Sequence, residues 1–206
     1  MSITLKRNDV WESLAAICLL VAPILLVIPF IVSGILSDFQ LAYYVIYAVY
    51  IVGSLLIMKY SKHEWSEFGL SRTNLSDSLS LSLGFVVAFI ITQTIHLELH
   101  FSTELGPIVV IQELVFCFAF SGPAQELLFR GVLFFSLMRW KDWKTALVVS
   151  SVLFGLVHVL KGIQYVIATI LIGFFYGYIT YRTRNIIGPI VAHSLNNFIL
   201  GFILVP

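Results

Sequence analysis

Three short segments in the second half of the chain carry ionisable or amide side chains at helical spacing. Glu126 and Arg130 are four residues apart in PAQELLFRG, and His193 and Asn197 are four apart in HSLNN. A third segment, FGLVH, ends at His158. Carboxylates and imidazoles can transfer protons and activate a water, and amide donors can stabilise an oxyanion. If the three segments converge, the chain holds the groups needed to hydrolyse a polar bond.

Each of these features also has a purely structural interpretation. Residues four apart share one face of a helix, so the Glu126–Arg130 pair could simply neutralise itself and lock helices together. His158 lies one turn after Phe154 and could be a hydrogen-bonded packing group. The pair His193 and Asn197 could be a polar contact between two helices. The conjunction of all three segments favours a catalytic site over these alternatives.

Other hydrolytic chemistries find little support in the sequence. The chain contains no HExxH zinc motif, and its four aspartates lie at or near expected loops, which argues against a buried aspartyl pair. Ser121 followed by Gly122 is only a weak match to a nucleophile motif. Glutamate-plus-histidine chemistry is what remains.

Composition predicts the elements that must position these residues. The chain has 206 residues, of which 59% are hydrophobic and 11% charged, and its mean hydropathy is +0.98. Soluble domains carry about 25% charged residues, so a soluble enzyme is excluded and an all-α polytopic transmembrane helix bundle is expected. A formal net charge of +1 argues against nucleic acid as a partner. Seven apolar segments predict about seven spans within a single membrane domain, 1–206; they are 12–36, 41–59, 78–97, 107–138, 143–160, 163–181 and 186–205.

The fourth segment, 107–138, is unusually long. As one helix it would reach roughly 48 Å, whereas the hydrocarbon core of a bilayer is about 30 Å thick. Gly122 and Pro123 lie in its middle. The segment is therefore predicted to be tilted, kinked or split.

Charge placement predicts the orientation in the membrane. With seven spans, ten of the twelve Lys and Arg residues fall on one side, Arg130 lies inside a span, and Lys161 is the one basic residue on the other side. Basic loops stay in the cytoplasm. The N-terminus is therefore expected in the cytoplasm and the C-terminus outside.

At the polar segments the chain resembles the CPBP family, also called the Abi family, of CAAX proteases and bacteriocin-processing enzymes. The family pattern is Glu-Glu-x-x-x-Arg, then Phe-x-x-x-His, then His-x-x-x-Asn or Asp, on successive core helices. The counterparts here run from Gln125 to Arg130, from Phe154 to His158, and from His193 to Asn197. The resemblance covers roughly 105–205, which we take as the catalytic core.

This resemblance implies an intramembrane peptidase with a polar cavity. In the family the first glutamate and the first histidine, here Gln125 and His158, are thought to activate the attacking water. The second histidine and the asparagine, His193 and Asn197, are thought to form an oxyanion hole. No cofactor is expected; two imidazoles and a carboxylate could hold zinc, but the spacing does not require it. The implied substrates are membrane-embedded or lipidated peptides and protein termini.

Gln125 is a departure from the family pattern, because glutamate usually stands there. An amide cannot take a proton from water. Three explanations stay open: Glu126 supplies the base, the chain is an inactive relative, or the substitution is an inactivating one. The rival function is a catalytically impaired relative that acts as a bacteriocin self-immunity factor or a membrane signalling partner. A small transporter is a third alternative, but the sequence has no repeat symmetry to support it.

Overall fold

Within the described residues, each apolar segment marked in the sequence is mainly helical in the structure, a computed structural model that describes residues 3–33, 39–102 and 106–205. The all-α prediction is confirmed. The elements other than the long fourth segment are α1 (Ile3–Val32), α2 (Phe39–Tyr60), η1 (Trp65–Phe68), α3 (Leu75–His96), β1 (His100–Phe101), α7 (Trp143–Leu156), η4 (Val159–Lys161), α8 (Ile163–Thr183), α9 (Ile187–Phe198), η5 (Ile199–Ile203) and β2 (Leu204–Val205).

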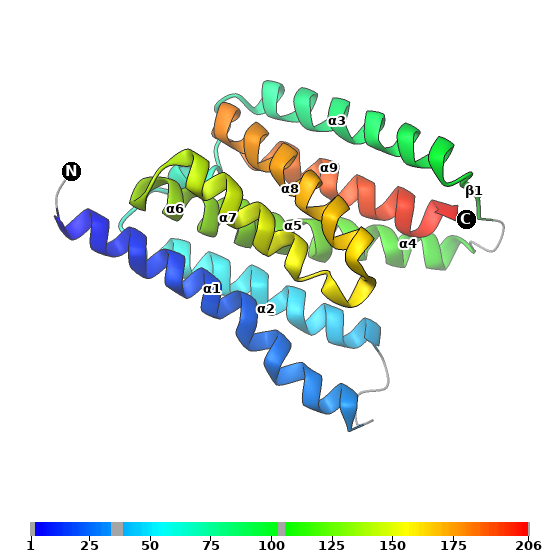
Figure 1. The fold of residues 1–206 in the computed structure, drawn as a ribbon, viewed down its shortest axis with the longest axis horizontal. Helices are drawn as coiled ribbons and strands as arrows, with labels where there is room; N and C mark the ends of the chain where they lie inside the picture. Colours follow the sequence, from blue (N-terminus) through cyan, green and yellow to red (C-terminus); the bar gives the residue numbers. More distant parts are fainter. Residues whose placement is uncertain (1–2, 34–38, 103–105, 206) are drawn as a thin grey trace.

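The fourth segment is one composite helix that crosses the whole bundle (Figure 1). Its parts are α4 (Pro107–Val115), η2 (Phe116–Ser121), α5 (Gly122–Glu126), η3 (Leu127–Phe134) and α6 (Phe135–Trp140). It is continuous rather than split. η2 and η3 are wider, π-helical turns, a form that is frequent at functional sites. Pro123 lacks an N–H and its ring crowds the preceding turn, which gives a physical reason for the wide turn just before it.

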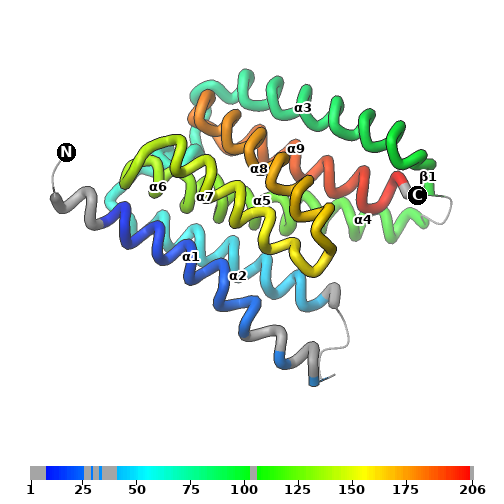
Figure 2. The backbone as a smooth tube through the Cα atoms, viewed as in Figure 1, coloured from blue at the N-terminus to red at the C-terminus, as the bar shows by residue number. Residues whose placement is uncertain are grey.

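Consecutive apolar segments run in alternating directions, so the chain passes back and forth between two ends of the bundle (Figure 2). Within the described residues five helical stretches are long and apolar enough to span a membrane. α7, with 14 residues, would reach only about 21 Å at 1.5 Å per residue, and the apolar helix Ile187–Ile203 is also shorter than the five. The structure thus supports a polytopic membrane protein, and the count of seven spans stays a prediction.

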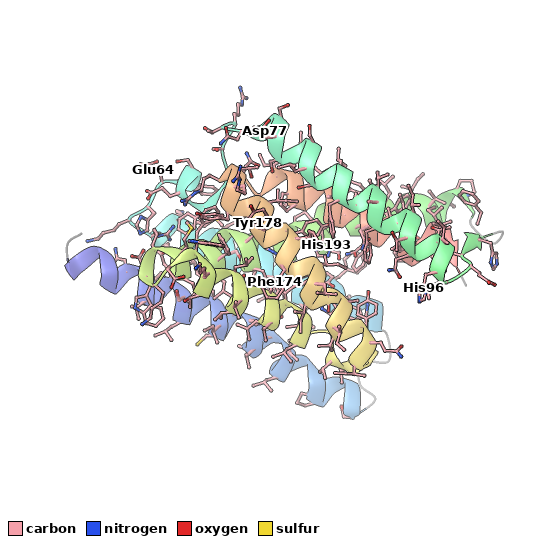
Figure 3. All side chains as sticks on the ribbon, turned by 45° about the horizontal axis from the view of Figure 1, so that its top comes forward. Glu64, Asp77, His96, Phe174, Tyr178 and His193 are labelled. Carbon is pink, nitrogen blue, oxygen red and sulfur yellow. The ribbon has the colours of Figure 1, made fainter. Side chains whose placement is uncertain are left out.

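The connections gather at two opposite ends. Glu64 and Asp77 lie at one end and His96 at the other (Figure 3). The turn before α7 is capped by Asp142, whose carboxylate accepts hydrogen bonds from the backbone N–H groups of Lys144 (2.8 Å) and Thr145 (3.0 Å). Hydrogen bonds from the hydroxyl and amide of Thr145 hold the pKa of Asp142 below its ordinary value of 3.8.

The composite helix forms the centre of the molecule. All eight residues of η3 are buried, and the composite helix packs against α1, α2, α7 and α9. At the far end of the bundle, β1 pairs with β2 in a two-residue antiparallel ladder, with His100 opposite Val205. This short ladder ties the end of α3 to the end of α9 without changing the all-α class.

Candidate active site

Two adjacent residues of α5 face in different directions. Gln125 lines a cavity and is 4% exposed, whereas Glu126 is fully buried and does not line it. The carboxylate oxygen Oε1 of Glu126 accepts a hydrogen bond of 3.0 Å from Nη1 of Arg130. The predicted i, i+4 ion pair is therefore present, and it lies behind the cavity wall.

Arg130 is held from three sides although it is fully buried. Besides Glu126, its Nη2 donates to the carbonyl oxygen of Gly173 in α8, at 3.4 Å. Its guanidinium carbon lies 4.3 Å from the centre of the Phe154 ring, a cation–π distance. Arg130 therefore contacts the Glu126 carboxylate from within the bundle, and its predicted role of orienting that carboxylate stays a prediction.

His193 reaches the same carboxylate from α9. Its Nδ1 lies 2.7 Å from Oε1 of Glu126, and its ring stacks on Tyr176 with centroids 5.9 Å apart. His193 also lines the cavity and lies in the interior of the bundle (Figure 3). His193 and Asn197 share a face of α9, but their side chains have different partners, Glu126 and Ser121.

His158 was expected within a helical segment ending at residue 160, and this expectation is wrong. α7 ends at Leu156, and His158 lies in the turn that follows it. The chain must reverse here to begin α8 at Ile163, and Gly162, with φ of +100°, makes the turn. Nδ1 of His158 lies 2.8 Å from the carbonyl oxygen of Phe154.

The Phe154 ring links the two histidines. Its centroid is 5.3 Å from that of His158 and 5.5 Å from that of His193, and both contacts are edge-on. The same ring packs under Arg130. Phe154 therefore contacts residues from three elements, and the orienting role predicted for it stays a prediction.

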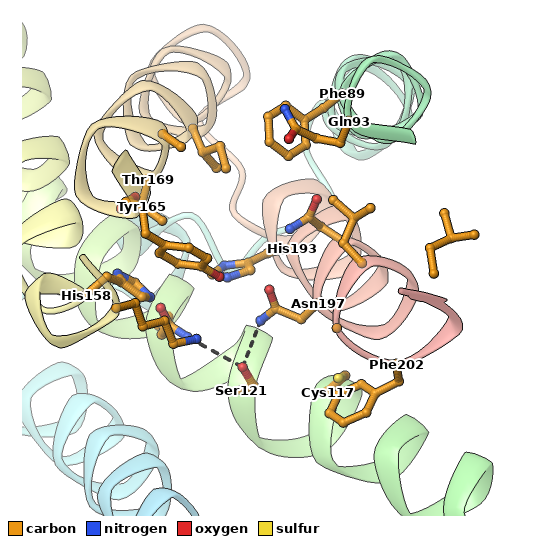
Figure 4. Close-up of a pocket in the computed structure, with 18 of the residues that line it drawn as sticks. Phe89, Gln93, Cys117, Ser121, His158, Tyr165, Thr169, His193, Asn197 and Phe202 are labelled. Atoms are coloured by element: carbon orange, nitrogen blue, oxygen red, sulfur yellow. Dashed lines mark hydrogen bonds between the residues drawn. The ribbon is translucent and has the colours of Figure 1, made fainter. Parts of the chain in front are cut away.

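Amide and hydroxyl groups that hydrogen-bond one another form one part of the cavity wall. Nδ2 of Asn197 donates to Oγ of Ser121 at 2.9 Å, and Nε2 of Gln125 lies 3.5 Å from the same oxygen (Figure 4). Nε2 of Gln125 also donates to the Tyr47 hydroxyl at 3.3 Å. Sequence reasoning missed Tyr47 and treated Ser121 only as a weak nucleophile. The contact between Gln125 and Ser121 could have been predicted, because the two residues are four apart on one helix. No signal in the sequence pointed to the contact between Gln125 and Tyr47.

The cavity enclosed by these groups measures about 500 Å³. Figure 4 shows His158, His193, Asn197 and Ser121 around it. Its remaining wall is mainly aromatic and aliphatic, and Lys161 is the charged residue among the described lining residues. Four of the five predicted catalytic residues thus share one space, and the fifth, Glu126, is connected to it through His193.

The donor set of the cavity does not suit a metal ion. Glu126 does not line the cavity, and Gln125, which does, offers an amide in place of a carboxylate. Within the described residues, the group of three potential metal donors that lie close together is elsewhere in the molecule. The zinc alternative therefore has no support in this cavity.

Fold and site together define a class of protein: a helical membrane protein with an interior polar cavity that carries histidine and amide side chains. Residues 107–199 match the family model described as type II CAAX prenyl endopeptidase Rce1-like. The resemblance predicted from three motifs is thereby confirmed for residues 107–199, which are similar to the CAAX-protease family. Comparisons of the chain with curated proteins and with solved structures gave no match.

Proposed function

We propose that the protein is an intramembrane endopeptidase in a multi-pass, cell-membrane setting. It hydrolyses a peptide bond in a membrane-embedded or lipidated peptide or protein terminus. The observation that carries this proposal is the shared cavity: Gln125, His158, His193 and Asn197 line one space although they come from segments far apart in the chain. The family match to residues 107–199 supports peptidase chemistry.

The cavity wall favours an apolar peptide segment. Aromatic side chains such as Tyr43, Tyr47, Phe116 and Tyr165 line it, and such rings bind apolar groups while the hydroxyls remain available for hydrogen bonds. Helices with exposed apolar faces surround the site. A substrate that already resides in the bilayer would reach this wall without leaving an apolar environment.

Charge balance supports a role for His193 as a proton acceptor. Arg130 neutralises Glu126, so a second positive charge on the buried His193 would be uncompensated. We therefore assign His193 as neutral, with Nδ1–H donating to Glu126. Its Nε2 is then the basic nitrogen on the cavity side, where it can take a proton from a water, in the way that a carboxylate orients a histidine base. Glu126 acts as a positioning residue in this arrangement.

Because Gln125 stands where the family pattern has a glutamate, this position cannot supply a general base, and water activation is weaker. Oε1 of Gln125 is buried and has no hydrogen-bond partner among the described residues, so it can accept a hydrogen bond from a water without taking its proton. Asn197 and His158 would orient the peptide carbonyl and the water. On this view the protein retains hydrolysis at a reduced rate.

The second candidate is a non-catalytic relative that binds peptide as a self-immunity factor or signalling partner. One observation favours it: Nε2 of Gln125 donates to Tyr47 and lies against Ser121, so the amide is integrated into the wall as a hydrogen-bond donor. A cavity of this kind keeps its shape without the negative charge.

The test is cleavage of fluorescent, membrane-anchored peptides by the purified protein in liposomes. We expect slow cleavage that is lost in His158→Ala and in His193→Ala. His96→Ala is the matched control, because His96 is exposed at the end of α3. Absence of cleavage across a varied peptide set, together with retained peptide binding, would favour the non-catalytic candidate.

A further inference from the structure

A second group of buried ionisable side chains comes from a part of the sequence that is far from the predicted catalytic residues. It consists of Asp9 and Glu12 of α1 and His63 of the connection between α2 and η1, here called the N-terminal cluster. Both carboxylates are fully buried, and the His63 side chain is 8% exposed. One donor atom from each residue lies within 4.8 Å of the other two. The proposed peptidase mechanism makes no use of this cluster.

Among the described residues, one guanidinium faces both carboxylates. Arg139 of α6 donates from Nε to Oδ1 of Asp9 at 2.9 Å and from Nη2 to Oε2 of Glu12. With a neutral imidazole, the cluster therefore retains one uncompensated negative charge. Ser61 donates a hydrogen bond to Oε1 of Glu12 without adding charge, so a cation bound at the cluster would compensate a charge whose burial is otherwise costly.

Asp9 also carries an unused oxygen. Its carboxylate lies inside the cluster, because Oδ1 is 2.9 Å from Nε2 of His63 as well as from Arg139. Its Oδ2 is shielded from solvent and has no hydrogen-bond partner in the part of the chain that the structure describes. A buried carboxylate oxygen without a partner is a position that an ion can satisfy.

His63 is oriented in the way of a metal ligand. Its Nδ1 lies 3.2 Å from Oε2 of Glu67, and a ligating histidine usually donates its other ring N–H to a carboxylate. Nε2 then presents a lone pair to Oδ1 of Asp9 at 2.9 Å and to Oε1 of Glu12 at 3.9 Å. Two lone pairs this close repel each other, so either the ring carries its proton on Nε2 and donates it to Asp9, or a metal ion lies between the two atoms.

We propose that Asp9, Glu12 and His63 form a binding site for a divalent transition-metal ion of the Zn²⁺ class. Two carboxylates and one imidazole are a suitable ligand set for such an ion, with a water as the fourth ligand. Ligand atoms of a tetrahedral zinc site lie roughly 3.3 Å apart, so the donors need only a small inward movement. The ion would tie α1 to the α2–η1 connection, next to Arg139 at the end of the composite helix.

The experiment uses the full-length protein in detergent, treated with a chelator and then titrated with Zn²⁺ by calorimetry and with Co²⁺ by visible absorption. We expect one ion per chain and a rise in Tm on addition of Zn²⁺. His63→Gln should weaken binding by more than about 100-fold, and Glu67→Gln by about 10- to 100-fold. Glu67 is an exposed side chain, so this second variant tests the site even if His63→Gln does not fold.

Two controls locate the ion. His100→Gln, which changes an exposed histidine at the opposite end, should leave binding unchanged. The pair His158→Ala and His193→Ala should also retain it. The proposal is wrong if the intact protein takes up neither Zn²⁺ nor Co²⁺, in which case the ring carries the proton, or if uptake is lost only in the cavity variants.

Discussion

At the scale of single residues, the main question is what Gln125 does to the chemistry. The side chain lines the cavity, whereas Glu126 is buried behind it in contact with Arg130 and His193. The position that faces the cavity is thus the one that carries an amide. Glutamine and glutamate have nearly the same shape, so a carboxylate can be introduced here without altering the volume of the wall.

We predict that Gln125→Glu raises peptide turnover in liposomes by at least about tenfold, because general-base catalysis typically contributes 10²–10⁴-fold. His158→Ala should abolish the gain. Turnover is measured for the two proteins and for Glu126→Gln under identical conditions. If Gln125→Glu changes turnover little, the His193–Glu126 pair is sufficient as the base without a carboxylate at position 125, and this prediction fails.

The Glu126–Arg130 pair has a consequence for stability as well. Both side chains are fully buried, and removal of one partner of a buried pair leaves an unpaired charge at a cost of about 3–5 kcal/mol. Arg130→Met and Glu126→Gln are therefore each expected to lower the free energy of unfolding by this amount. Reversible unfolding in mixed detergent micelles measures it. The double variant should lose clearly less free energy of unfolding than the sum of the losses in the two single variants. Strictly additive losses would show that the two residues do not act as a pair.

At the scale of elements, close approach of α5 and α9 brings Glu126 and His193 together. Gly122 allows this approach, because a Cβ at this position would overlap Oγ of Ser194 and lie 3.1 Å from the carbonyl oxygen of Ile190. The wide turn η2 directly precedes it and holds Ser121, the shared acceptor for Asn197. Helix contact and cavity geometry therefore depend on the same turn.

We expect Gly122→Ala to separate α5 from α9, at a cost of about 1–3 kcal/mol for overpacking, and to reduce peptide cleavage. Thermal unfolding and the liposome assay record the two effects. Gly84→Ala in α3 is the matched control, since no atom lies within 4 Å of a Cβ there. Addition of Ser194→Gly should restore part of the loss. Equal Tm values for Gly122→Ala and Gly84→Ala would contradict the close contact.

At the scale of the whole molecule, the alternating course of the chain and the distribution of basic residues agree. The connections after α2, α6 and α8 lie at the same end as the N-terminus (Figure 1), and these are the connections that carry most of the Lys and Arg residues. The positive-inside rule then predicts that this end is cytoplasmic. The N-terminal cluster lies at this end and the β1–β2 ladder at the other.

We predict that an enzymatic reporter fused after Pro206 is active only on the external side of the membrane. A reporter inserted in the turn between Lys141 and Asp142 should be active only in the cytoplasm. The comparison is made in whole cells with one external-active and one cytoplasm-active reporter. A cytoplasmic signal after Pro206 would mean an even number of spans, and the short helix α7 would be the first element to re-examine.

The sequence by itself determined the class of protein and the local pairs. Long apolar segments exclude a soluble domain, since each must find an apolar environment. The Glu126–Arg130 contact was predictable because a spacing of four on a helix places two side chains on one face. The three motifs likewise predicted the family to which residues 107–199 match. The catalytic roles of the motif residues remain proposals.

Only the tertiary structure decided the partners that come from distant segments. The contact of His193 with Glu126, that of Gln125 with Tyr47, and the cluster of Asp9, His63 and Arg139 all depend on how the helices are rotated against one another. Helical periodicity gives the face of a residue within its own helix but not the element that covers that face. The end of α7 at Leu156 was likewise decided by the tertiary structure. The helix stops where the chain must reverse, although the sequence stays apolar beyond that point.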